Sequence, residues 1–277
     1  MSNFNAAEYW EGRLRGNVAL EKIGYLGLGR HYNEWLYRVR ESVFRRTVKS
    51  LGVDLSASSV MDVGSGSGFY VRLWKELGAR QITGLDLTSA AVEHLRGRFP
   101  DTPFYKADIT EATLPVCGPQ FDIISAFDVL FHIVDDARYR SAIANIHSLL
   151  RPGGLFLLSD VFVHGKVSRS EHFVSRPLAE AEQVLRESGF QVLRRQPVFV
   201  LMANPVDSPS RIRRLMWGAF QRVVSRSELA GFLAGAALCP VEILLSSMIR
   251  EGCSTEIMIC KKAVPAQKAR PSPGPSP

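Results

Sequence analysis

The chain has few cysteines and lacks the signs of a secreted or metal-binding protein. Its four cysteines, Cys117, Cys239, Cys253 and Cys260, include no pair with the CxxC spacing of a zinc or redox site, and no His-rich run accompanies them. We therefore expect neither a disulfide framework nor a bound metal. The N-terminal stretch MSNFNAAEYWEGRLRG contains no apolar segment of the kind found in signal peptides. These absences predict reduced thiols and a cytoplasmic location.

Long apolar runs are scarce, and the one that is long enough to cross a bilayer has features against doing so. Residues 229–249 are apolar except for two serines and one glutamate. Pro240 and Glu242 lie in the second half, where a charge is costly in lipid. Gly231 and Gly235 weaken the segment as a helix. The sequence therefore predicts a buried or lid segment here and no transmembrane helix.

Charge of one sign is in modest excess. The formal net charge of +7 favours anionic partners such as phosphorylated substrates, nucleic acid or an acidic membrane surface. Solvated helix faces can account for most of that excess. The composition, 46% hydrophobic and 22% charged, is that of a globular chain with a sizeable core. A length of 277 residues fits one large α/β domain with added elements.

From residue 58 onward, apolar runs typical of strands alternate with helical periodicity. Alternation at this pitch predicts a mostly parallel sheet with helices on both faces. The predicted strands are SSVMDV, QITGLDL, PFYKADI, FDIISAF, GLFLLSDVF, FQVLRRQPVFV and TEIMICKK. The predicted helices are FYVRLWKELG, Thr88 to Phe99, Ala137 to Leu150 and Leu178 to Ser188.

Three segments surround or interrupt this alternation. Residues 1–57 form an N-terminal helical cap, with a helix expected from Trp35 to Leu51 after a glycine-dotted aromatic loop. Residues 204–252 interrupt the main domain, 58–262, between its last two strands. They join a basic stretch to an apolar one, and we expect them to be helical. Residues 263–277 form a Pro/Ser-rich tail that we expect to be disordered.

The most informative motif follows the first predicted strand. Asp62-Val63-Gly64-Ser65-Gly66-Ser67-Gly68 lets the backbone turn sharply and approach a ligand beside a helix N-terminus. Its spacing is GxGxG, and Phe69 stands where a dinucleotide fingerprint has a third small residue. Asp86 ends the second strand, where a carboxylate can accept both ribose hydroxyls. Asp108 ends the third, where it can accept from an adenine amino group while Ile109 packs on the ring.

These residues resemble the class I S-adenosylmethionine-dependent methyltransferases of the small-molecule type. The likeness continues in the fourth strand, residues 121–128, and in Leu149-Leu150-Arg151-Pro152-Gly153-Gly154, which is similar to the family's L-x-P-G-G turn. It covers about residues 58–200 and the last strand. The resemblance implies a Rossmann-like, mostly parallel seven-stranded sheet with an antiparallel last strand, and S-adenosyl-L-methionine as the cofactor.

The resemblance also assigns the cofactor-binding residues by position. Asp62 would lie near the methionine ammonium, Asp86 would hold the ribose and Asp108 the adenine. Each carboxylate alone could merely cap a turn, but their order at consecutive strand ends favours one ligand site. The implied cofactor-binding residues are Asp62, Gly64, Ser65, Gly66, Gly68, Asp86, Leu87, Asp108, Ile109, Ala126 and Phe127.

Methyl transfer mainly needs the acceptor and the methyl group to be aligned, and a hydroxyl acceptor also benefits from a general base. His132, just past the fourth strand, is the candidate catalytic base, although it could instead pack beside the cofactor or bond a backbone carbonyl. His31 is a secondary candidate. The N-terminal segment and the insertion 204–252 should roof the acceptor site. Aromatic candidates for its walls are Tyr9, Trp10, Tyr25, Tyr32, Trp35 and Trp217, each of which could instead belong to a local core.

The leading functional prediction is methyl transfer to a small-molecule acceptor, hydrophobic or anionic, with O-methylation favoured. RNA or protein methylation is an alternative that the charge suggests. No NPPY-type motif follows the fourth strand and no RNA-binding module is recognisable, so we expect no specific nucleic acid partner. A non-catalytic cofactor-binding or scaffold protein is another alternative, whereas Phe69 argues against a dehydrogenase. Residues 204–252 could also contact an acidic membrane surface. The sequence leaves the oligomeric state open.

Overall fold

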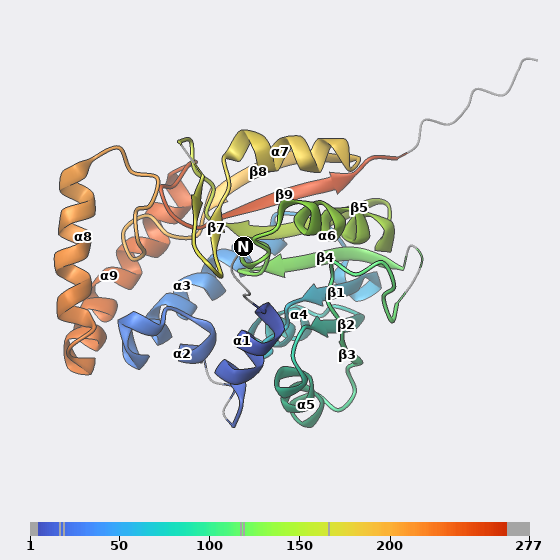
Figure 1. The fold of residues 1–277 in the computed structure, drawn as a ribbon, viewed down its shortest axis with the longest axis horizontal. Coiled ribbons are helices and arrows are strands. Elements are labelled where there is room, and N and C mark those ends of the chain that lie inside the picture. Colours follow the sequence, from blue (N-terminus) through green and yellow to red (C-terminus); the bar gives the residue numbers. More distant parts are fainter. Residues whose placement is uncertain are drawn as a thin grey trace, which may run out of the picture.

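The computed structural model describes residues 5–16, 18, 20–116, 118, 120–165 and 167–264. Its centre is a seven-stranded sheet in the order β3-β2-β1-β4-β5-β9-β8 (Figure 1). β9 runs antiparallel to both its neighbours, and the remaining pairs are parallel, which confirms the predicted fold. The strands of this sheet are β1 (Ser59–Val63), β2 (Gln81–Asp86), β3 (Phe104–Lys106), β4 (Phe121–Phe127), β5 (Leu150–Asp160), β8 (Phe190–Pro197) and β9 (Glu256–Lys262).

Helices begin where the sequence supplies side-chain caps. Thr88 accepts a hydrogen bond from the N–H of Ala91 at the start of α5, as expected, and Asp135 caps α6 in the same way. The helix predicted from Trp35 begins earlier, at Arg30, because the chain turns at Gly29 with a φ of 69°. The helices are α1 (Ala6–Leu14), α2 (Leu20–Ile23), α3 (Arg30–Lys49), α4 (Phe69–Glu76), α5 (Ser89–Arg98), α6 (Asp136–Leu149), α7 (Leu178–Glu187), α8 (Arg211–Val224) and α9 (Glu228–Met248).

Two hydrophobic cores cover the two faces of the sheet. Side chains of α3 and α4, including Phe44 and Trp74, pack against one face, and buried side chains of α8 and α9 continue this core beyond α3. Side chains of α6 and α7, including Ile143 and Leu185, pack against the other. The N-terminal segment thus shares a core with the domain that follows it, and the division at residue 57 stays a prediction. Within the predicted tail, residues 265–277 lie outside the described residues, as does Cys117.

Two features differ from the sequence-based expectations. A small antiparallel hairpin, β6 (Ser168–Arg169) with β7 (Val174–Ser175), was not predicted; strands this short give no periodic signal. Helix α9, residues 228–248, is long and apolar enough to span a membrane. Only 28% of its most apolar 18-residue stretch is buried inside the protein. Of the two alternatives expected for this segment, buried or lid, burial is wrong for its outward face.

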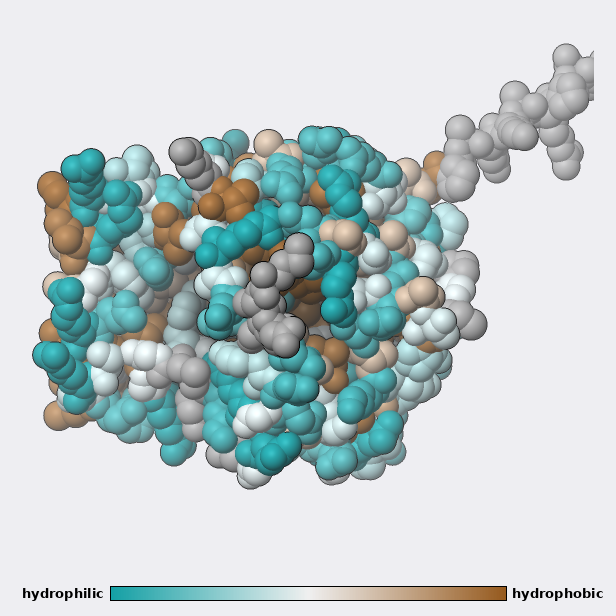
Figure 2. Space-filling model, viewed as in Figure 1, coloured by the Kyte–Doolittle hydropathy of each residue, from teal (hydrophilic) through white to brown (hydrophobic). Residues whose placement is uncertain are grey.

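The insertion makes up one end of the molecule. α8 and α9 lie at the left in Figure 1, and apolar side chains alternate with polar ones along that edge in Figure 2. α9 packs along α3 at glycines: a Cβ on Gly235 would lie 2.2 Å from Cδ1 of Trp35. The buried carboxylate of Glu242 accepts hydrogen bonds from the backbone N–H groups of Leu201 and Met202, at 2.8 and 2.7 Å, and of Val200. These contacts fix α9 on the body of the protein.

Candidate functional site

The glycine turn after β1 has the geometry that its sequence predicts. Gly64, Gly66 and Gly68 have φ angles of 70°, 50° and 77°, in the left-handed region that favours glycine. A Cβ on Gly64 would lie 2.3 Å from Cγ2 of Val129. The N–H groups of Gly64 and Ser65 both donate to the carbonyl of Leu85, at 2.7 and 3.2 Å. The turn is therefore held against the end of β2, with no room for side chains at Gly64.

Asp62 is a buried carboxylate at the end of β1, with 2% of its surface exposed. Its Oδ1 accepts a hydrogen bond of 2.7 Å from Ser125 of β4, and that hydroxyl accepts one of 3.1 Å from the indole N–H of Trp74. Burial raises the pKa of Asp62 to about 7, and the hydrogen bond from Ser125 opposes that rise. A cationic ligand beside this carboxylate would stabilise its ionised form, so the residue fits the ammonium of the expected cofactor.

Asp86 ends β2 and holds the glycine turn directly. Its Oδ2 accepts from the N–H of Gly66 at 2.8 Å, while Oδ1 accepts from the N–H and the hydroxyl of Thr88 at 2.9 and 2.8 Å. Burial raises the pKa of this carboxyl. A carboxylate offers about four acceptor positions. One ribose hydroxyl would donate to the acceptor position that is left on Oδ2. The other would take the position on Oδ1 that the rotatable Thr88 hydroxyl now occupies.

Asp108 does not end a strand as predicted, because β3 stops at Lys106. It lies two residues later in a turn, where its Oδ1 accepts from the N–H and the hydroxyl of Thr110 at 2.9 and 2.7 Å. Its Oδ2 pairs with Arg138 of α6 at 2.5 Å. Aspartate side chains compete with the backbone for hydrogen bonds. The bonds that the Asp108 side chain makes to Thr110 favour a turn over continued strand pairing, so the strand ends early. The carboxylate stays at the same edge of the sheet as Asp62 and Asp86.

The other predicted cofactor residues lie along this edge. Ala126 and Phe127 are buried at the end of β4, and the ring of Phe127 stacks on Tyr70 with a centroid distance of 4.4 Å. Ile109 is buried beside Asp108, and Leu87 is half-buried in the turn before α5. The structure thus brings the predicted residues to consecutive loops of β1, β2, β3 and β4, where open parallel sheets bind ligands.

The N-terminal segment lies over these loops (Figure 1). The carboxylate of Glu11, in α1, accepts from the N–H groups of Ser89 and Ala90 at 2.7 and 3.2 Å, which caps α5 from outside. A Cβ on Gly66 would lie 3.7 Å from Cγ2 of Ile23, in α2. α1 and α2 therefore cover the predicted cofactor residues. An open pocket of ≈ 440 Å³ borders the turn at Ser67.

His132 lies in a single 3₁₀ turn after β4, close to the place expected for a base. Its Nδ1 is 2.7 Å from the carbonyl oxygen of His172, so Nδ1 carries the proton and Nε2 has the lone pair. The indole of Trp10 packs edge-on against the imidazole at 4.8 Å between centroids. Burial lowers the pKa of His132 to about 4, so the ring is neutral near pH 7. His31, the secondary candidate, instead faces Glu228 of α9.

A buried ion pair beyond the end of β4 was missed at the sequence level. Arg40 of α3, 6% exposed, lies 2.8 Å from Oδ2 of Asp128. Asp128 has a φ of 58°, and its Oδ1 accepts a 3.0 Å hydrogen bond from Ser159 of β5. Burial raises the pKa of Tyr37 and Tyr70 nearby. Arg40 is one of several arginines in α3, so only three-dimensional packing distinguishes it from the solvated ones.

The aromatic residues proposed for the acceptor walls divide into two groups. Tyr32 packs against Phe220 of α8, and Trp35 packs against Phe232 of α9, so these two join α3 to the insertion. Trp217 also packs on Phe220. Tyr9, Trp10 and Tyr25 lie nearer the site: the first two pack on His172 and His132, and the charges of Arg40 and Asp128 act on the third.

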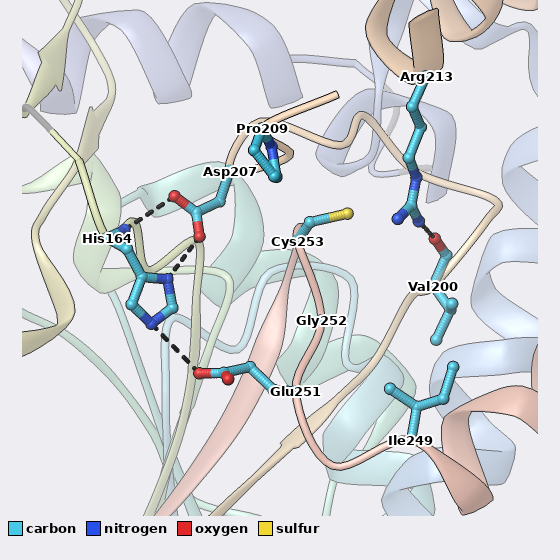
Figure 3. Close-up of a pocket in the computed structure, with 9 residues that line it drawn as sticks. All are labelled: His164, Val200, Asp207, Pro209, Arg213, Ile249, Glu251, Gly252 and Cys253. Atoms are coloured by element: carbon cyan, nitrogen blue, oxygen red, sulfur yellow. Dashed lines mark hydrogen bonds and ion pairs between the residues drawn. The ribbon is translucent and has the colours of Figure 1, made fainter. Parts of the chain in front are cut away.

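A second open pocket, of ≈ 370 Å³, is lined by His164 of the loop after β5 and by residues of the insertion such as Asp207 and Arg213 (Figure 3). His164 stands between two carboxylates there, with Nδ1 2.6 Å from Asp207 and Nε2 3.2 Å from Glu251. Asp207 raises the pKa of His164. The three side chains join the loop after β5 to both ends of the insertion. Within the described part of the chain, no group of three His, Cys, Asp or Glu side chains could hold a metal ion.

Known proteins share this chain's sequence motifs and its fold. Residues 60–154 match the family model of a methyltransferase domain. A probable S-adenosylmethionine-dependent methyltransferase of Mycolicibacterium smegmatis is 31% identical over 166 residues, 58% of this chain and 60% of the relative. The O-methyltransferase cnsE of Penicillium expansum is 27% identical over 188 residues, 61% of this chain and 66% of the relative. The crystal structure of the cyclase SpnF has a TM-score of 0.52 at 20% identity, covering 82% of this chain and 81% of its own, which shows a shared fold.

The sheet order and the carboxylates around the glycine turn define a Rossmann-like α/β protein with a ligand site at the carboxyl edge of its sheet. Residues 60–154 thus match a methyltransferase domain, and the relatives support a likeness to the class I S-adenosylmethionine-dependent methyltransferases. The family implies S-adenosyl-L-methionine as the methyl donor. The alignments span 56% to 60% of the length of the first curated relatives, so the activity of the whole protein is a matter for proposal.

Proposed function

We propose that this protein transfers a methyl group from S-adenosyl-L-methionine to a small-molecule acceptor, with oxygen as the favoured acceptor atom. The observation that carries the proposal is the row of carboxylates Asp62, Asp86 and Asp108 around a glycine turn that leaves no room for a side chain at Gly64 or Gly68. The name of the Penicillium expansum relative, an O-methyltransferase, supports oxygen as the acceptor atom.

The acceptor would bind beyond the end of β4, between the glycine turn and α3. Tyr37 and Tyr70 offer apolar surface there, and Arg40 with Asp128 offers a cation and an anion. This combination suits a largely apolar acceptor with one polar or anionic group. Arg40 and Asp128 can form hydrogen bonds or an ion pair with that group in place of the contact that they make with each other. The elements that surround this space, α1 to α3, belong to the N-terminal segment.

His132 would act as the general base through Nε2, since Nδ1 is engaged by the carbonyl of His172. S-adenosylmethionine, held by Asp62, Asp86 and Asp108, would supply a methyl group on a sulfonium, with a neutral thioether as the by-product. An oxygen that has accepted a methyl group is strongly acidic until it loses its proton, so an imidazole with a pKa of about 4 is basic enough to accept it. A weak base at this position fits late proton removal better than prior activation of an alcohol.

The decisive experiment is calorimetric titration with S-adenosylmethionine, S-adenosylhomocysteine and NAD in parallel. We expect both adenosyl ligands to bind, Asp86→Ala to lower their affinity at least a hundredfold, and NAD not to bind. Asp101→Ala, which removes an exposed carboxylate beyond α5, is the matched control and should leave affinity unchanged. Well-folded protein that binds neither adenosyl ligand would overturn the proposal.

The acceptor and the base need separate tests. A mass-spectrometric screen for a gain of one methyl group identifies the acceptor class. Adenosyl binding with no transfer to any hydroxyl, amine, thiol or RNA would favour the scaffold alternative. The cyclase SpnF shares the fold of this chain, so the fold alone does not establish methyl transfer. His132→Asn with unchanged cofactor affinity and unchanged turnover would remove the base assignment. The cytoplasmic location expected from the cysteines stays a prediction.

A further inference from the structure

The large apolar side chains that the protein exposes are concentrated in the insertion. Of sixteen such residues in the described chain, eleven lie between Ile212 and Ile249. A contiguous apolar surface is uncommon on a soluble monomer and usually indicates a binding surface. The eleven are Ile212, Leu215, Met216, Val223, Leu229, Phe232, Leu233, Val241, Leu244, Met248 and Ile249.

α9 has one face fixed on the protein and one face exposed. Its buried residues Gly231, Gly235, Glu242 and Ser246 follow helical spacing and contact α3 or the loop 200–202. The opposite face, which includes Leu229, Leu233, Leu244 and Met248, is apolar and carries no charge from 229 to 248. Because the buried face is anchored and contains a carboxylate, α9 cannot leave the body to span a bilayer, but its outer face is free to lie on one.

α8 adds a basic flank to an apolar outer face. Its inner side packs through Trp217 and Val224, and Ile212, Met216 and Val223 point away from that contact. Residues 211–250 contain six arginines and two glutamates, which is +4 of the chain's +7. Of the two glutamates, Glu242 is buried, whereas Glu228 is half-exposed and accepts from the N–H groups of Arg30 and His31 at 2.9 Å each.

We propose that the outer faces of α8 and α9 form a docking surface for an anionic lipid bilayer, with the exposed Arg211 and Arg222 of α8 at the headgroups. Arg213 and Arg214 instead donate to the carbonyls of Val200 and Ser208. Helices that lie in a membrane interface combine an apolar face with flanking basic residues, as these do. A second copy of the chain fits less well. In a symmetric interface the same arginines would meet one another, with Glu228 as the single exposed acidic residue of residues 211–250. The surface lies along the left edge in Figure 2.

The proposal does not depend on methyl transfer, and vesicle flotation of the full chain tests it. The probes are phosphatidylcholine vesicles with and without phosphatidylglycerol. We expect flotation only with the anionic vesicles, weakened by added salt. Arg211→Glu with Arg222→Glu should reduce partitioning more than tenfold, because each basic residue near the surface contributes roughly fivefold. Leu233→Ser with Leu244→Ser should reduce it at least tenfold.

Matched controls change the same residue types elsewhere on the surface. Leu193→Ser on β8 and Arg80→Glu before β2, both exposed, should float like the unmodified chain. Thermal unfolding of each variant verifies that it is folded. Absence of flotation, equal flotation with neutral vesicles, or equal effects of the control substitutions would overturn the proposal. So would a dimer that Leu233→Ser with Leu244→Ser dissociates while vesicles stay unbound.

Discussion

The carboxyl edge of the sheet and the α8–α9 end depart from an ordinary globular surface in opposite directions. At the edge, carboxylates and a guanidinium are buried: Asp62, Asp86 and Arg40 are each less than 10% exposed. At the α8–α9 end, four leucines and two methionines are 58% to 73% exposed. Both arrangements cost folding free energy. The proposed ligand site is thus built from buried charged groups, and the proposed docking surface from exposed apolar ones.

The largest expected effect is on the buried ion pair. Arg40→Met leaves the carboxylate of Asp128 without its cation, and removing one partner of a buried pair costs about 3–5 kcal/mol of unfolding free energy. Asp128 is 22% exposed, so the lower end of that range applies. Chemical denaturation measures the effect, with Arg38→Met, an exposed neighbour in α3, as the control at under about 1 kcal/mol. If both variants unfold alike, the edge does not depend on this pair.

Alanine in the glycine turn should destabilise the protein much more at Gly64 than at Gly66. Gly64→Ala combines a positive φ with a contact of 2.3 Å to Val129, and we expect a loss of about 2–4 kcal/mol and of adenosyl binding. Gly66→Ala has a positive φ but a nearest atom at 3.7 Å, so about 1–2 kcal/mol is expected. Calorimetric unfolding and titration compare the two. Equal losses would mean that backbone strain alone matters.

Much of this edge follows from the sequence, since glycines and strand-end aspartates are local signals. The positions of Asp62 and Asp86 needed only strand boundaries, whereas Asp108 was misplaced by two residues because its side chain bonds the following turn. Arg40 could not be distinguished from the solvated arginines of α3 by sequence alone, because its burial depends on where α3 packs against β4. The exposed face of α9 was missed for a similar reason. Its composition indicates burial, and only packing shows which residues touch α3.

At the α8–α9 end, substitutions of two glycines distinguish a packing effect from a helix-propensity effect. Gly235→Ala in α9 would place a Cβ 2.2 Å from the ring of Trp35, and overpacking should cost about 1–3 kcal/mol. Gly218→Ala in α8 meets no atom within 4 Å and should instead stabilise the protein by up to about 1 kcal/mol through helix propensity. Thermal unfolding gives both signs. Destabilisation by Gly218→Ala would show an unseen contact on α8.

The smallest effect concerns His164, which joins both ends of the insertion. Asp207 raises its pKa above the ordinary value, so the folded protein binds this proton more tightly than the unfolded chain. The stabilisation is present below about pH 6.5 and is lost as the pH rises through the raised value. It is small, because the imidazole is 54% exposed. The melting temperatures of the unmodified chain and His164→Gln should differ at about pH 6 and converge near pH 9. A constant difference would rule out the charge as the cause.

The position of β9 between β5 and β8 has a consequence for synthesis on the ribosome. β8 pairs only with β9 in the sheet, yet 58 residues separate the two strands in the chain. At about 5–20 residues per second, β8 waits roughly 3–12 seconds for its partner. During that interval the whole insertion emerges, so α8 and α9 can pair before the sheet is complete. Until then β5 and β8 both present open edges to the nascent chain and to chaperones.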